Sequence, residues 1–394
     1  MAGKNLPILV VGGGIGGLAA ALALSKKGRA VQVLEQAAAF GEIGAGIQLG
    51  SNVFKMFAYL GLTEAINRAA VFPDNLIMRD ALSGEELISV PVGSEAFRAR
   101  FKYPYGVTHR ADIHGAFLEA CQKSPLVTLF ASQKVVGYED KGDRVAVSTE
   151  GGASFEGEVL IGADGLWSTV RALLVGDGKP RVSGHIAYRA VIPTSKVPAH
   201  LQQNDVVLWA GPKTHLVHYP LRRGEVYNLV VVFHSSRYEE GWDTYGDPEE
   251  LHERFKGERP EVLEFLAMVN AWKMWVLCDR EPIKGWSKGR IVLLGDAAHP
   301  MLQYLAQGAC MATEDAVVLA NRIEAAKGDY ASAFDAYEKE RYLRTARVQL
   351  MARFYGEVYH AMDVKRDLRN SLLKNATPEG AINGAAWLYE GIPV

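Results

Sequence analysis

Residues 7–35, PILVVGGGIGGLAAALALSKKGRAVQVLE, contain every part of one βαβ unit. The apolar run Ile8–Val11 is typical of a buried parallel strand, and a glycine-rich turn follows it directly. A helix is predicted over Leu18–Leu24, and the second apolar run, Ala30–Leu34, is followed by Glu35. A strand, a glycine-rich turn, a helix, a second strand and an acidic residue in about 30 residues predict a dinucleotide-binding unit.

The glycines of the turn, Gly12, Gly14 and Gly17, have the G-x-G-x-x-G spacing. Gly12 allows the tight turn, Gly14 lets a pyrophosphate approach the backbone, and Gly17 lets the helix lie close to the sheet. The N–H groups and the dipole at the start of the helix favour phosphate. Glu35 would accept hydrogen bonds from ribose hydroxyls and would repel the phosphate of NADP. We therefore expect FAD or NAD as the ligand.

Composition excludes several classes of protein. The 394 residues are enough for two domains, and 48% hydrophobic with 22% charged residues is ordinary for a globular protein. A net charge of −2 gives no bulk attraction to nucleic acid or anionic membrane. Cys121, Cys278 and Cys310 lack the spacing of a zinc site or disulfide framework. Without a signal core at the start or an uninterrupted apolar span, we expect a cytoplasmic protein with no transmembrane helix and no metal.

The next part of the chain alternates loops, helices and short strands. Phe40–Asn52 contains four glycines and predicts a loop whose backbone approaches something flat or charged. A helix is expected over Val53–Leu62, behind a Ser51/Asn52 cap signal. Another helix is expected to begin soon after Val107, with Arg110 near its first turn. A cation there is not favoured by the helix dipole, so an anionic partner for Arg110 is plausible.

Strands dominate the middle of the sequence. Two paired strands are expected at 76–79 and 87–90, and further strands at 127–130, 134–139, 144–148 and 159–162. Four more, at 187–192, 206–210, 215–221 and 226–233, have few helices between them and predict an antiparallel sheet. A charged helical piece at 248–268 interrupts this region. Helices are predicted at 310–324 and 330–365.

Two further signals follow predicted buried strands. Asp164-Gly165 comes after the strand at 159–162, and Gly295-Asp296 ends the strand that begins near Gly289. Polar groups at the carboxyl ends of parallel strands lie where α/β sheets hold ligands. With the first glycine motif, these make three signals that would face one dinucleotide.

In this order and spacing, the three motifs resemble those of the single-component FAD-dependent aromatic hydroxylases, the group that includes salicylate hydroxylase and para-hydroxybenzoate hydroxylase. The resemblance covers essentially the whole chain. It implies an α/β fold with a Rossmann-like FAD-binding domain (1–75, 101–178 and 280–320). It also implies an inserted, mostly antiparallel substrate domain (76–100 and 179–279) and a C-terminal helical segment (321–394).

The resemblance assigns residues to FAD. Gly12, Gly14 and Gly17 would hold the pyrophosphate and Glu35 the ribose. Arg110 would contact the phosphate or ribityl region, Asp164 would contact FAD and shape the approach of nicotinamide, and Asp296 would bind a ribityl hydroxyl. The segment 300–308, which ends at Gly308, would pass beside the isoalloxazine. Only one G-x-G-x-x-G is present, so NADH is expected to visit transiently as co-substrate.

The activity of this family implies what the substrate pocket contains. Reduced flavin reacts with oxygen to give a C4a-hydroperoxide, which hydroxylates an electron-rich ring. A phenol substrate needs a proton acceptor nearby, and water must be excluded. Strand alternation puts His215, Val217 and Tyr219 on one face, and a histidine with its ordinary pKa near 6.5 could accept a phenol proton. Gln303 lies in the loop expected beside the flavin.

His215, Tyr219 and Gln303, with the run QYLAQGACM from Gln303, resemble most closely the 3-hydroxybenzoate 6-hydroxylases. This implies catalytic roles for the three residues and conversion of 3-hydroxybenzoate to 2,5-dihydroxybenzoate (gentisate) with NADH and O2. The wider group has a proline in place of Gln303. No certain arginine holds the substrate carboxylate: Arg189 and Arg222 are candidates. The alternative hypothesis is that Gln48, placed among the cofactor-binding residues, binds the carboxylate together with backbone N–H groups.

Other functions stay open at this point. Close alternatives are a salicylate 1-hydroxylase that forms catechol, and a hydroxylase of a hydroxylated N-heterocycle. A different class is a flavin-binding redox sensor that hydroxylates nothing. The apolar residues near the C-terminus, Leu372, Leu373, Trp387 and Leu388, could either close a homodimer or cover the chain's own core. His109, His114 and His299 are expected to be structural rather than reactive.

Overall fold

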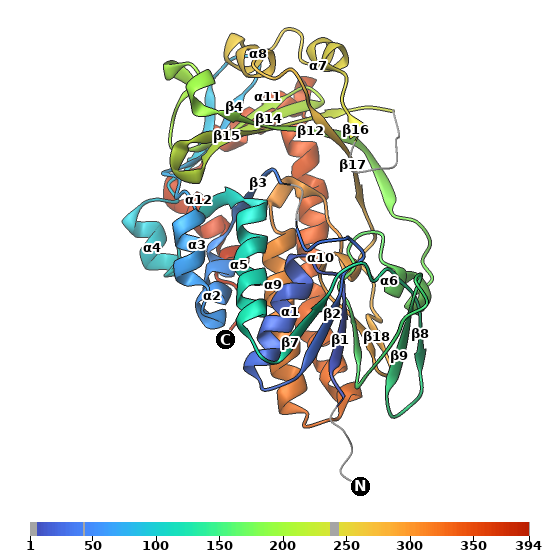
Figure 1. Cartoon of the computed structure of the whole chain (residues 1–394). Coiled ribbons are helices and arrows are strands. Elements are labelled where there is room, and N and C mark those ends of the chain that lie inside the picture. The colour runs from blue at the N-terminus through green and yellow to red at the C-terminus, as the bar shows by residue number, and fades with distance from the viewer. Residues whose placement is uncertain (1–5, 42–43, 237–243, 394) are drawn as a thin grey trace.

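The structure is a computed structural model and describes residues 6–41, 44–236 and 244–393. One layer, at the lower right of Figure 1, is a six-stranded sheet in the order β18-β19-β11-β1-β2-β7. Its neighbours are parallel except β18 and β19. The strands are β1 (Ile8–Val11), β2 (Val31–Leu34), β7 (Val127–Phe130), β11 (Leu160–Gly162), β18 (Ser287–Lys288) and β19 (Ile291–Leu293). Strands buried on both faces read as continuous apolar runs, which is why β1 was predictable.

Helices cover one face of this sheet. Helix α1 (Ile15–Lys26) packs against α5 (Arg110–Lys123) and α9 (Gly308–Ala325). A three-stranded antiparallel sheet of β8 (Val135–Asp140), β9 (Val145–Thr149) and β10 (Ser154–Gly157) adjoins β1 through β10. The helix α6 (Thr169–Leu174) follows β11. This part of the chain brings the starts of α1 and α9 to the same edge of the sheet.

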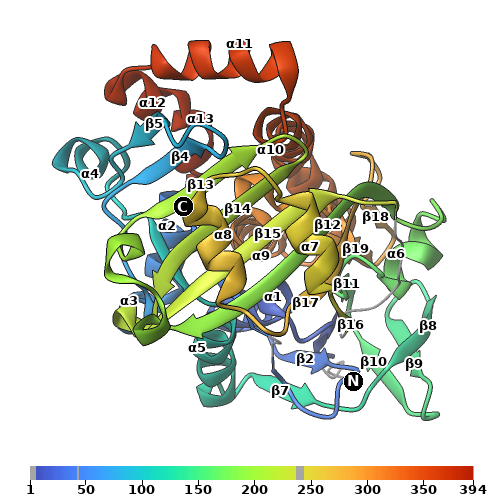
Figure 2. The same cartoon turned by 90° about the horizontal axis from the view of Figure 1, so that it is seen from above.

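The second layer is an eight-stranded sheet, in the upper half of Figure 1, with the order β16-β17-β12-β15-β14-β13-β4-β5. Its neighbours are antiparallel except β4 and β13. The strands are β4 (Leu76–Asp80), β5 (Glu86–Val90), β12 (Arg181–Pro193), β13 (Val206–Gly211), β14 (Thr214–Leu221), β15 (Val226–His234), β16 (Thr244–Tyr245) and β17 (Lys273–Asp279). Helices α7 (Pro248–Arg254) and α8 (Pro260–Ala267) lie over its outer face (Figure 2).

The two faces of this sheet belong to two hydrophobic cores. Val217 and Tyr219 of β14 pack into the core shared with the six-stranded sheet, whereas Leu216 packs into the core beneath α7 and α8. The strand is buried along its whole length. The alternation predicted for residues 215–219 is therefore confirmed.

The remaining elements close the space between the layers. Two short strands, β3 (Gly46–Leu49) and β6 (Gly106–His109), pair antiparallel. The other helices are α2 (Ser51–Leu60), α3 (Thr63–Ala69), α4 (Glu95–Phe101), α10 (Tyr330–Tyr359), α11 (Asp363–Lys374), α12 (Pro378–Gly384) and α13 (Ala386–Tyr389). Helix α10 runs along the molecule toward the eight-stranded sheet (Figure 1). The expected fold class, a Rossmann-like α/β part with an antiparallel sheet and C-terminal helices, is confirmed; the domain boundaries given above stay a prediction.

Three local predictions were wrong. The loop predicted over 40–52, of which residues 42 and 43 lie outside the described part, contains strand β3, because it pairs with β6 about sixty residues away. Helix α2 has Gly50 as its N-cap, since the Ser51 hydroxyl donates instead to the carbonyl of Tyr389. The helical pattern at 248–268 is two helices, separated near Gly257, whose φ is +87°.

The long C-terminal helix also ends earlier than predicted. Helix α10 stops at Tyr359, and α11 begins at Asp363, whose φ is +51°. The residue after α10, His360, is buried and bonded to two other histidines. Tertiary contacts thus override a helical pattern that continues through the break.

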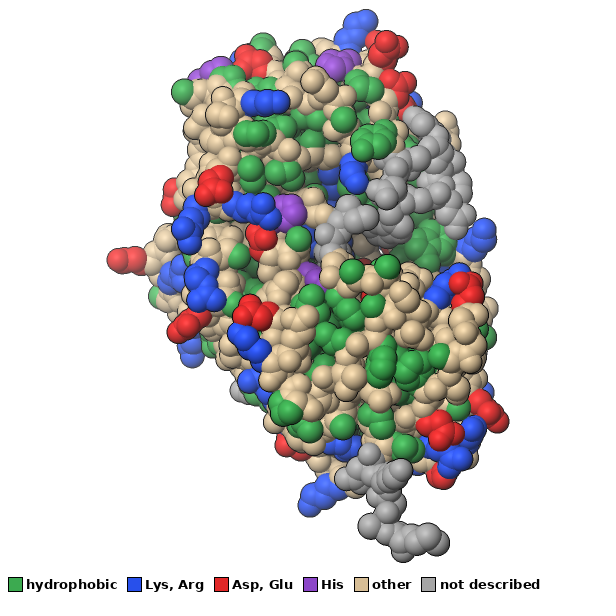
Figure 3. Space-filling model, viewed as in Figure 1, with side chains coloured by type: hydrophobic (Ala, Val, Ile, Leu, Met, Phe, Trp, Pro, Cys, Tyr) green, Lys and Arg blue, Asp and Glu red, His purple; other side chains and the backbone are tan. Residues whose placement is uncertain are grey.

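The distribution of charged side chains on the surface agrees with the small net charge. On the face shown in Figure 3, basic and acidic side chains are interspersed. No described helix combines the length and the apolar character that crossing a membrane requires.

Candidate active site

A cavity of about 610 Å³ lies between the two layers. Its walls come from the turn before α1, strand β3, the inner face of the eight-stranded sheet and the start of α9. Most of the predicted site residues line it: Gly14, Gln48, Arg110, His215, Tyr219, Asp296, Gln303 and Gly308. The others, Gly12, Gly17, Glu35 and Asp164, are not part of the lining. The structure therefore brings the three predicted catalytic residues to one space with five of the predicted flavin-facing residues.

The glycine motif is fixed by close backbone contacts. Gly12 has a φ of +106°, and a Cβ there would lie 2.3 Å from the carbonyl oxygen of Ala163. A Cβ on Gly17 would lie 1.9 Å from the carbonyl oxygen of Gly12. Gly14 is the N-cap of α1 and faces the cavity. The first and third glycines therefore pack the turn, and the second leaves its backbone open to a ligand.

Glu35 braces this turn from the end of β2. Its Oε2 accepts a hydrogen bond from the backbone N–H of Gly13, and its Oε1 accepts one from Ala37, both at 2.7 Å. The carbonyl of Gly13 is 2.8 Å from Nε2 of the buried His114, which therefore has the expected structural place. Each Glu35 oxygen keeps a further lone pair for a ribose hydroxyl.

Two helix N-termini meet at the cavity. Gly14, Ile15 and Gly16 at the start of α1 line it, and so do Gly308 and Ala309 at the start of α9, which packs against α1. The N–H groups and dipoles of both helices give this end of the cavity a positive potential. That is the environment that the pyrophosphate of a dinucleotide needs.

Asp296 adds an acceptor at the same end. Its side chain is exposed to the cavity, although protein surrounds it, and this desolvation raises the pKa of its carboxyl. Among the described residues none donates a hydrogen bond to this carboxyl. An acceptor that faces the cavity and has no donor among the described residues fits a ligand hydroxyl, as the ribityl chain of FAD would supply. The residues present therefore fit FAD.

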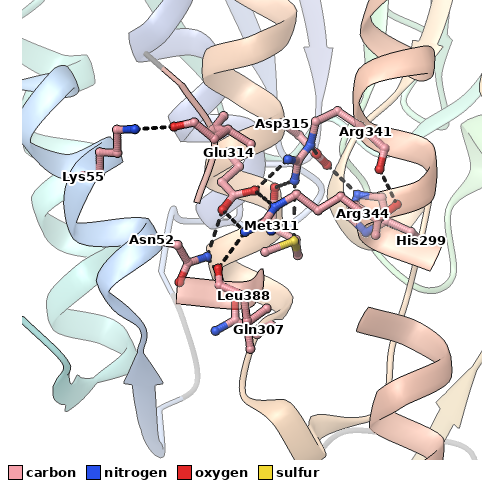
Figure 4. Close-up of polar contacts among 12 residues, drawn as sticks. Asn52, Lys55, His299, Gln307, Met311, Glu314, Asp315, Arg341, Arg344 and Leu388 are labelled. Carbon is pink, nitrogen blue, oxygen red and sulfur yellow. Dashed lines mark hydrogen bonds and ion pairs between the residues drawn. The ribbon is translucent and has the colours of Figure 1, made fainter. Parts of the chain in front are cut away.

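A buried ionic network holds the start of α9 in place (Figure 4). The side-chain amide of Asn52 donates to Oε1 of Gln307, the N-cap of α9, at 3.0 Å and to Glu314 at 2.9 Å. Arg341 and Arg344 of α10 both donate to Glu314, at 2.6 and 2.7 Å. Buried charges carry a large desolvation penalty that is offset only while their partners stay in place. This network therefore fixes α2, α9 and α10 relative to one another.

Two predicted polar residues order neighbouring loops. His299 Nε2 lies 2.5 Å from Asp315 of α9, so it anchors the segment after β19, as expected. The Asp164 carboxylate accepts hydrogen bonds from the hydroxyl of Ser168 at 2.5 Å and the N–H of Val170 at 3.1 Å. Asp164 thereby shapes the turn that puts Gly165 at the cavity wall.

Arg110 and Gln48 lie on neighbouring elements of the cavity wall. Arg110 is the first residue of α5, as predicted, and follows β6. Gln48 is on β3, and its Oε1 accepts a hydrogen bond from the hydroxyl of Tyr105 at 2.6 Å. This leaves the amide of Gln48 as a donor toward the cavity.

The opposite wall is the inner face of β14. His215, Val217 and Tyr219 line the cavity there. Burial lowers the pKa of His215 to about 3, so its imidazole is neutral at pH 7 and its ring nitrogen can accept a hydrogen bond. The pKa of 6.5 assumed from sequence was wrong in value, because desolvation disfavours the charged ring. Burial likewise raises the pKa of Tyr219, which keeps its hydroxyl protonated.

Gln303 and Arg189 complete this end of the cavity. The Arg189 guanidinium on β12 donates to Oε1 of Gln303 and lies 5.2 Å from the ring centroid of Trp275. Its Nε is buried and has no hydrogen-bond partner in the part of the chain that the structure describes. Burial and the nearby charge of Arg110 lower the pKa of Arg189 to about 10, so it remains a cation. Arg222, the other carboxylate candidate, instead pairs with Asp112 at 3.1 Å and is not part of the lining.

Sequence reasoning missed three histidines beside His215. His185 and His234 are opposite each other in the β12–β15 pair, and His360 bonds to His215 and His234. The antiparallel register of β12 and β15 could have indicated the first two. Nothing in the sequence near His360 indicates its position, because the helix break that places it is a tertiary effect.

Comparison with known proteins gives the same picture. A family model described as "FAD binding domain" matches residues 5–352. The 3-hydroxybenzoate 6-hydroxylase of Polaromonas naphthalenivorans (strain CJ2) is 48% identical over 385 residues, which cover 98% of this chain and 96% of that protein. The crystal structure of Klebsiella pneumoniae HpxO with FAD and uric acid is 26% identical, with a TM-score of 0.87, and the match covers 98% of this chain and 97% of that one. A salicylate hydroxylase substrate complex is 25% identical, with a TM-score of 0.82 and 99% of each chain covered.

The fold, the cavity between two helix N-termini and an antiparallel sheet, and these similarities agree. FAD is the cofactor, as the sequence predicted. The chain belongs to the FAD-binding monooxygenase family and is a flavoprotein aromatic hydroxylase.

Proposed function

We propose that this hydroxylase converts 3-hydroxybenzoate to 2,5-dihydroxybenzoate with NADH and O2. Full-length similarity to a 3-hydroxybenzoate 6-hydroxylase supports the substrate. The observation that carries the proposal is the set of side chains on one cavity wall: neutral His215 and Tyr219 on β14, Gln303, and the cation Arg189. Together they offer an acceptor for a phenol proton and a charge for a carboxylate.

Each substrate group has a matching side chain. His215 accepts the phenol proton, and Tyr219 and Gln303 orient the phenol oxygen by hydrogen bonds. Arg189 binds the carboxylate through its buried Nε–H, for which the described residues offer no acceptor. A ring with the two groups in meta positions would then be held at both ends. We prefer Arg189 to the earlier candidate Gln48, because a buried cation binds a carboxylate more strongly than a neutral amide does.

We further propose which residues hold each part of FAD. When bound, FAD supplies the oxygen-activating and electron-accepting chemistry. Gly14 and the start of α1 hold the pyrophosphate, with Gly12 and Gly17 packing the turn. The ribose hydroxyls bind Glu35, and the ribityl hydroxyls bind Asp296. Arg110 and the start of α9 at Gly308 face the more polar end of the flavin, and Asp164 holds the turn beside it. NADH binds transiently.

Product analysis tests the proposal. The purified yellow protein is incubated with NADH and 3-hydroxybenzoate in air, and the products are separated by chromatography. We expect gentisate in near one-to-one ratio to NADH. If the protein forms no gentisate but converts salicylate to catechol, the salicylate 1-hydroxylase alternative is favoured. Turnover of hydroxylated N-heterocycles alone would favour the N-heterocycle hydroxylase. If no aromatic compound stimulates NADH oxidation, a flavin-binding redox sensor would be favoured.

The His215 assignment has its own test. In His215→Ala, we expect the hydroxylation step to slow by about 10²–10⁴, the range of general acid–base assistance. NADH oxidation should then yield hydrogen peroxide instead of product. An unchanged hydroxylation rate with unchanged coupling would mean that His215 does not accept the proton.

We also propose a cytoplasmic homodimer. Val364, Leu368 and Leu372 form one stripe of α11 with i, i+4 spacing, and their side chains are 79%, 58% and 64% exposed. An apolar stripe of this kind is typical of a surface that another protein covers. Leu368→Glu should convert a dimer to a monomer in light scattering; an unchanged mass would refute this interface.

A further inference from the structure

Four histidines gather where the neighbouring interior strands β12, β15 and β14 of the eight-stranded sheet lie beside the end of α10. His185 comes from β12, His215 from β14 and His234 from β15, and His360 follows the end of α10. The ring centroids of His215 and His360 are 4.9 Å apart, as are those of His234 and His360. The reaction derived so far uses only His215 of these four residues.

The hydrogen bonds of three of these rings run in one line. His215 Nδ1 is 2.7 Å from His360 Nε2, and His360 Nδ1 is 3.0 Å from His234 Nε2. At one end, His215 lines the substrate cavity. At the other, half-buried His234 lines a second cavity of about 440 Å³, together with Lys213, Glu250 and Glu253. The line therefore joins two separate spaces through the buried ring of His360.

We infer that His215, His360 and His234 form a proton relay that carries the phenol proton from the substrate cavity to the second cavity. The inference rests on the proposed function, because it needs a substrate with an ionisable hydroxyl. It deepens that function by giving the proton accepted at His215 an exit. Without one, a buried ring would have to keep the charge.

The transfer is balanced at every atom. The phenol O–H bond breaks, and its proton binds Nε2 of His215 while the proton on Nδ1 moves to Nε2 of His360. The proton on Nδ1 of His360 moves to Nε2 of His234, and that on Nδ1 of His234 passes to water. The phenolate keeps the electron pair. Each imidazole ends neutral, with its proton moved from Nδ1 to Nε2.

The surroundings favour such a neutral chain. Burial lowers the pKa of His215 to about 3 and that of His360 well below its ordinary value, and it also lowers the pKa of His234. A charged ring in the middle of the line is therefore costly, which favours concerted transfer. The groups facing His234 are Lys213 and Arg254, which oppose its protonation, Glu357, which favours it, and the rings of His185 and His360.

A metal centre is the competing use of such a cluster. Nitrogens of His185, His234 and His360 lie within 4.8 Å of one another. Tetrahedral zinc with Zn–N bonds of about 2.0–2.1 Å would hold them roughly 3.3 Å apart and would need a lone pair from each. Here both nitrogens of His360 are already in hydrogen bonds to other rings, at 2.7 and 3.0 Å, and Nδ1 of His185 is 2.5 Å from the hydroxyl of Tyr304. These contacts favour shared protons.

The test follows proton release. Oxidised holoenzyme is mixed with 3-hydroxybenzoate in a stopped-flow instrument, in weak buffer with a pH-indicator dye, while flavin absorbance reports binding. In the wild type, we expect proton release to keep pace with the flavin signal. In His360→Gln, whose amide keeps hydrogen bonds but cannot exchange tautomers, binding should persist and release should slow at least tenfold.

Two further variants separate the relay from a loss of folding. His234→Gly should slow release equally, and imidazole in the medium should restore the rate, because the second cavity admits it. His218→Gln is the matched control: His218 is buried on the other face of β14 and accepts a hydrogen bond from Trp209 at 3.2 Å, which glutamine can also do. It should release protons at the wild-type rate.

Several results would overturn the relay. They are wild-type release rates in both His360→Gln and His234→Gly, or substrate binding without any proton release by the wild type. A rate that EDTA abolishes and zinc restores would assign the cluster to a metal. If 3-hydroxybenzoate does not bind, the proposed function fails, and the relay is judged by NMR of holoenzyme with ¹⁵N-labelled histidines. Couplings across the two N–H···N bonds would then support the relay, and their absence would refute it.

Discussion

Removing the charge of Arg189 is the sharpest probe of substrate recognition. Among the described residues none accepts a hydrogen bond from its buried Nε–H, and Arg189→Met keeps much of the side-chain volume while deleting the cation. A hydrogen bond to a charged group contributes about 1.5–3 kcal/mol, which corresponds to about 10- to 150-fold in affinity. We expect the Kd of 3-hydroxybenzoate to rise by that factor.

The assay is titration of the flavin absorbance of oxidised enzyme with 3-hydroxybenzoate and, separately, with 3-methylphenol, which lacks the carboxylate. The Kd of 3-methylphenol should change less than threefold in Arg189→Met. Arg222→Met is the matched control, since Arg222 pairs with Asp112 outside the cavity lining. Equal losses for both ligands, or no loss for 3-hydroxybenzoate, would refute a carboxylate–Arg189 contact.

Three further predictions concern the cofactor and the buried histidines. Asp296→Ala should weaken FAD retention; full yellow colour through gel filtration would count against this. Gly17→Ala, whose new Cβ would lie 1.9 Å from the Gly12 carbonyl, should give largely FAD-free protein by absorbance, whereas Gly115→Ala, with open space around it, should keep FAD. Burial lowers the pKa of His215 and His218 to about 3, against about 6.5 unfolded, so their contribution to the free energy of unfolding is complete above pH 6.5 and declines as the pH falls toward 3. Urea unfolding at pH 7.5, 6 and 5 checks this. The free energy of unfolding of His218→Gln should depend less steeply on pH than that of the wild type.

Local sequence signals predicted the parts of the fold that depend on neighbours in the chain. Residues 7–35 form a strand, turn, helix and strand within a few residues of the expected bounds, because backbone contacts at Gly12 and Gly17 demand glycine. The period of two along 215–219 separated the cavity face of β14 from its outer face. Such patterns indicate which side of one helix or strand is buried, but they do not indicate which other elements it packs against.

Features set by distant partners could not be predicted in this way. Strand β3 exists because it pairs with β6, and a Cβ on Gly46 would lie 2.7 Å from the hydroxyl of Tyr219. The choice between Arg189 and Arg222 depended on the Asp112 partner of the latter. His360 contacts His215 because α10 ends at Tyr359, and the periodicity of the α10 sequence does not indicate this break. Each of these needs the tertiary arrangement.

We propose above all that this flavoprotein inserts one oxygen atom from O2 into 3-hydroxybenzoate, para to its hydroxyl. The most direct measurement is a turnover with NADH under ¹⁸O2, followed by mass spectrometry of the product. We expect gentisate that carries a single ¹⁸O atom. Hydroxylated product without ¹⁸O, or ¹⁸O found only in hydrogen peroxide while 3-hydroxybenzoate is recovered unchanged, would contradict it.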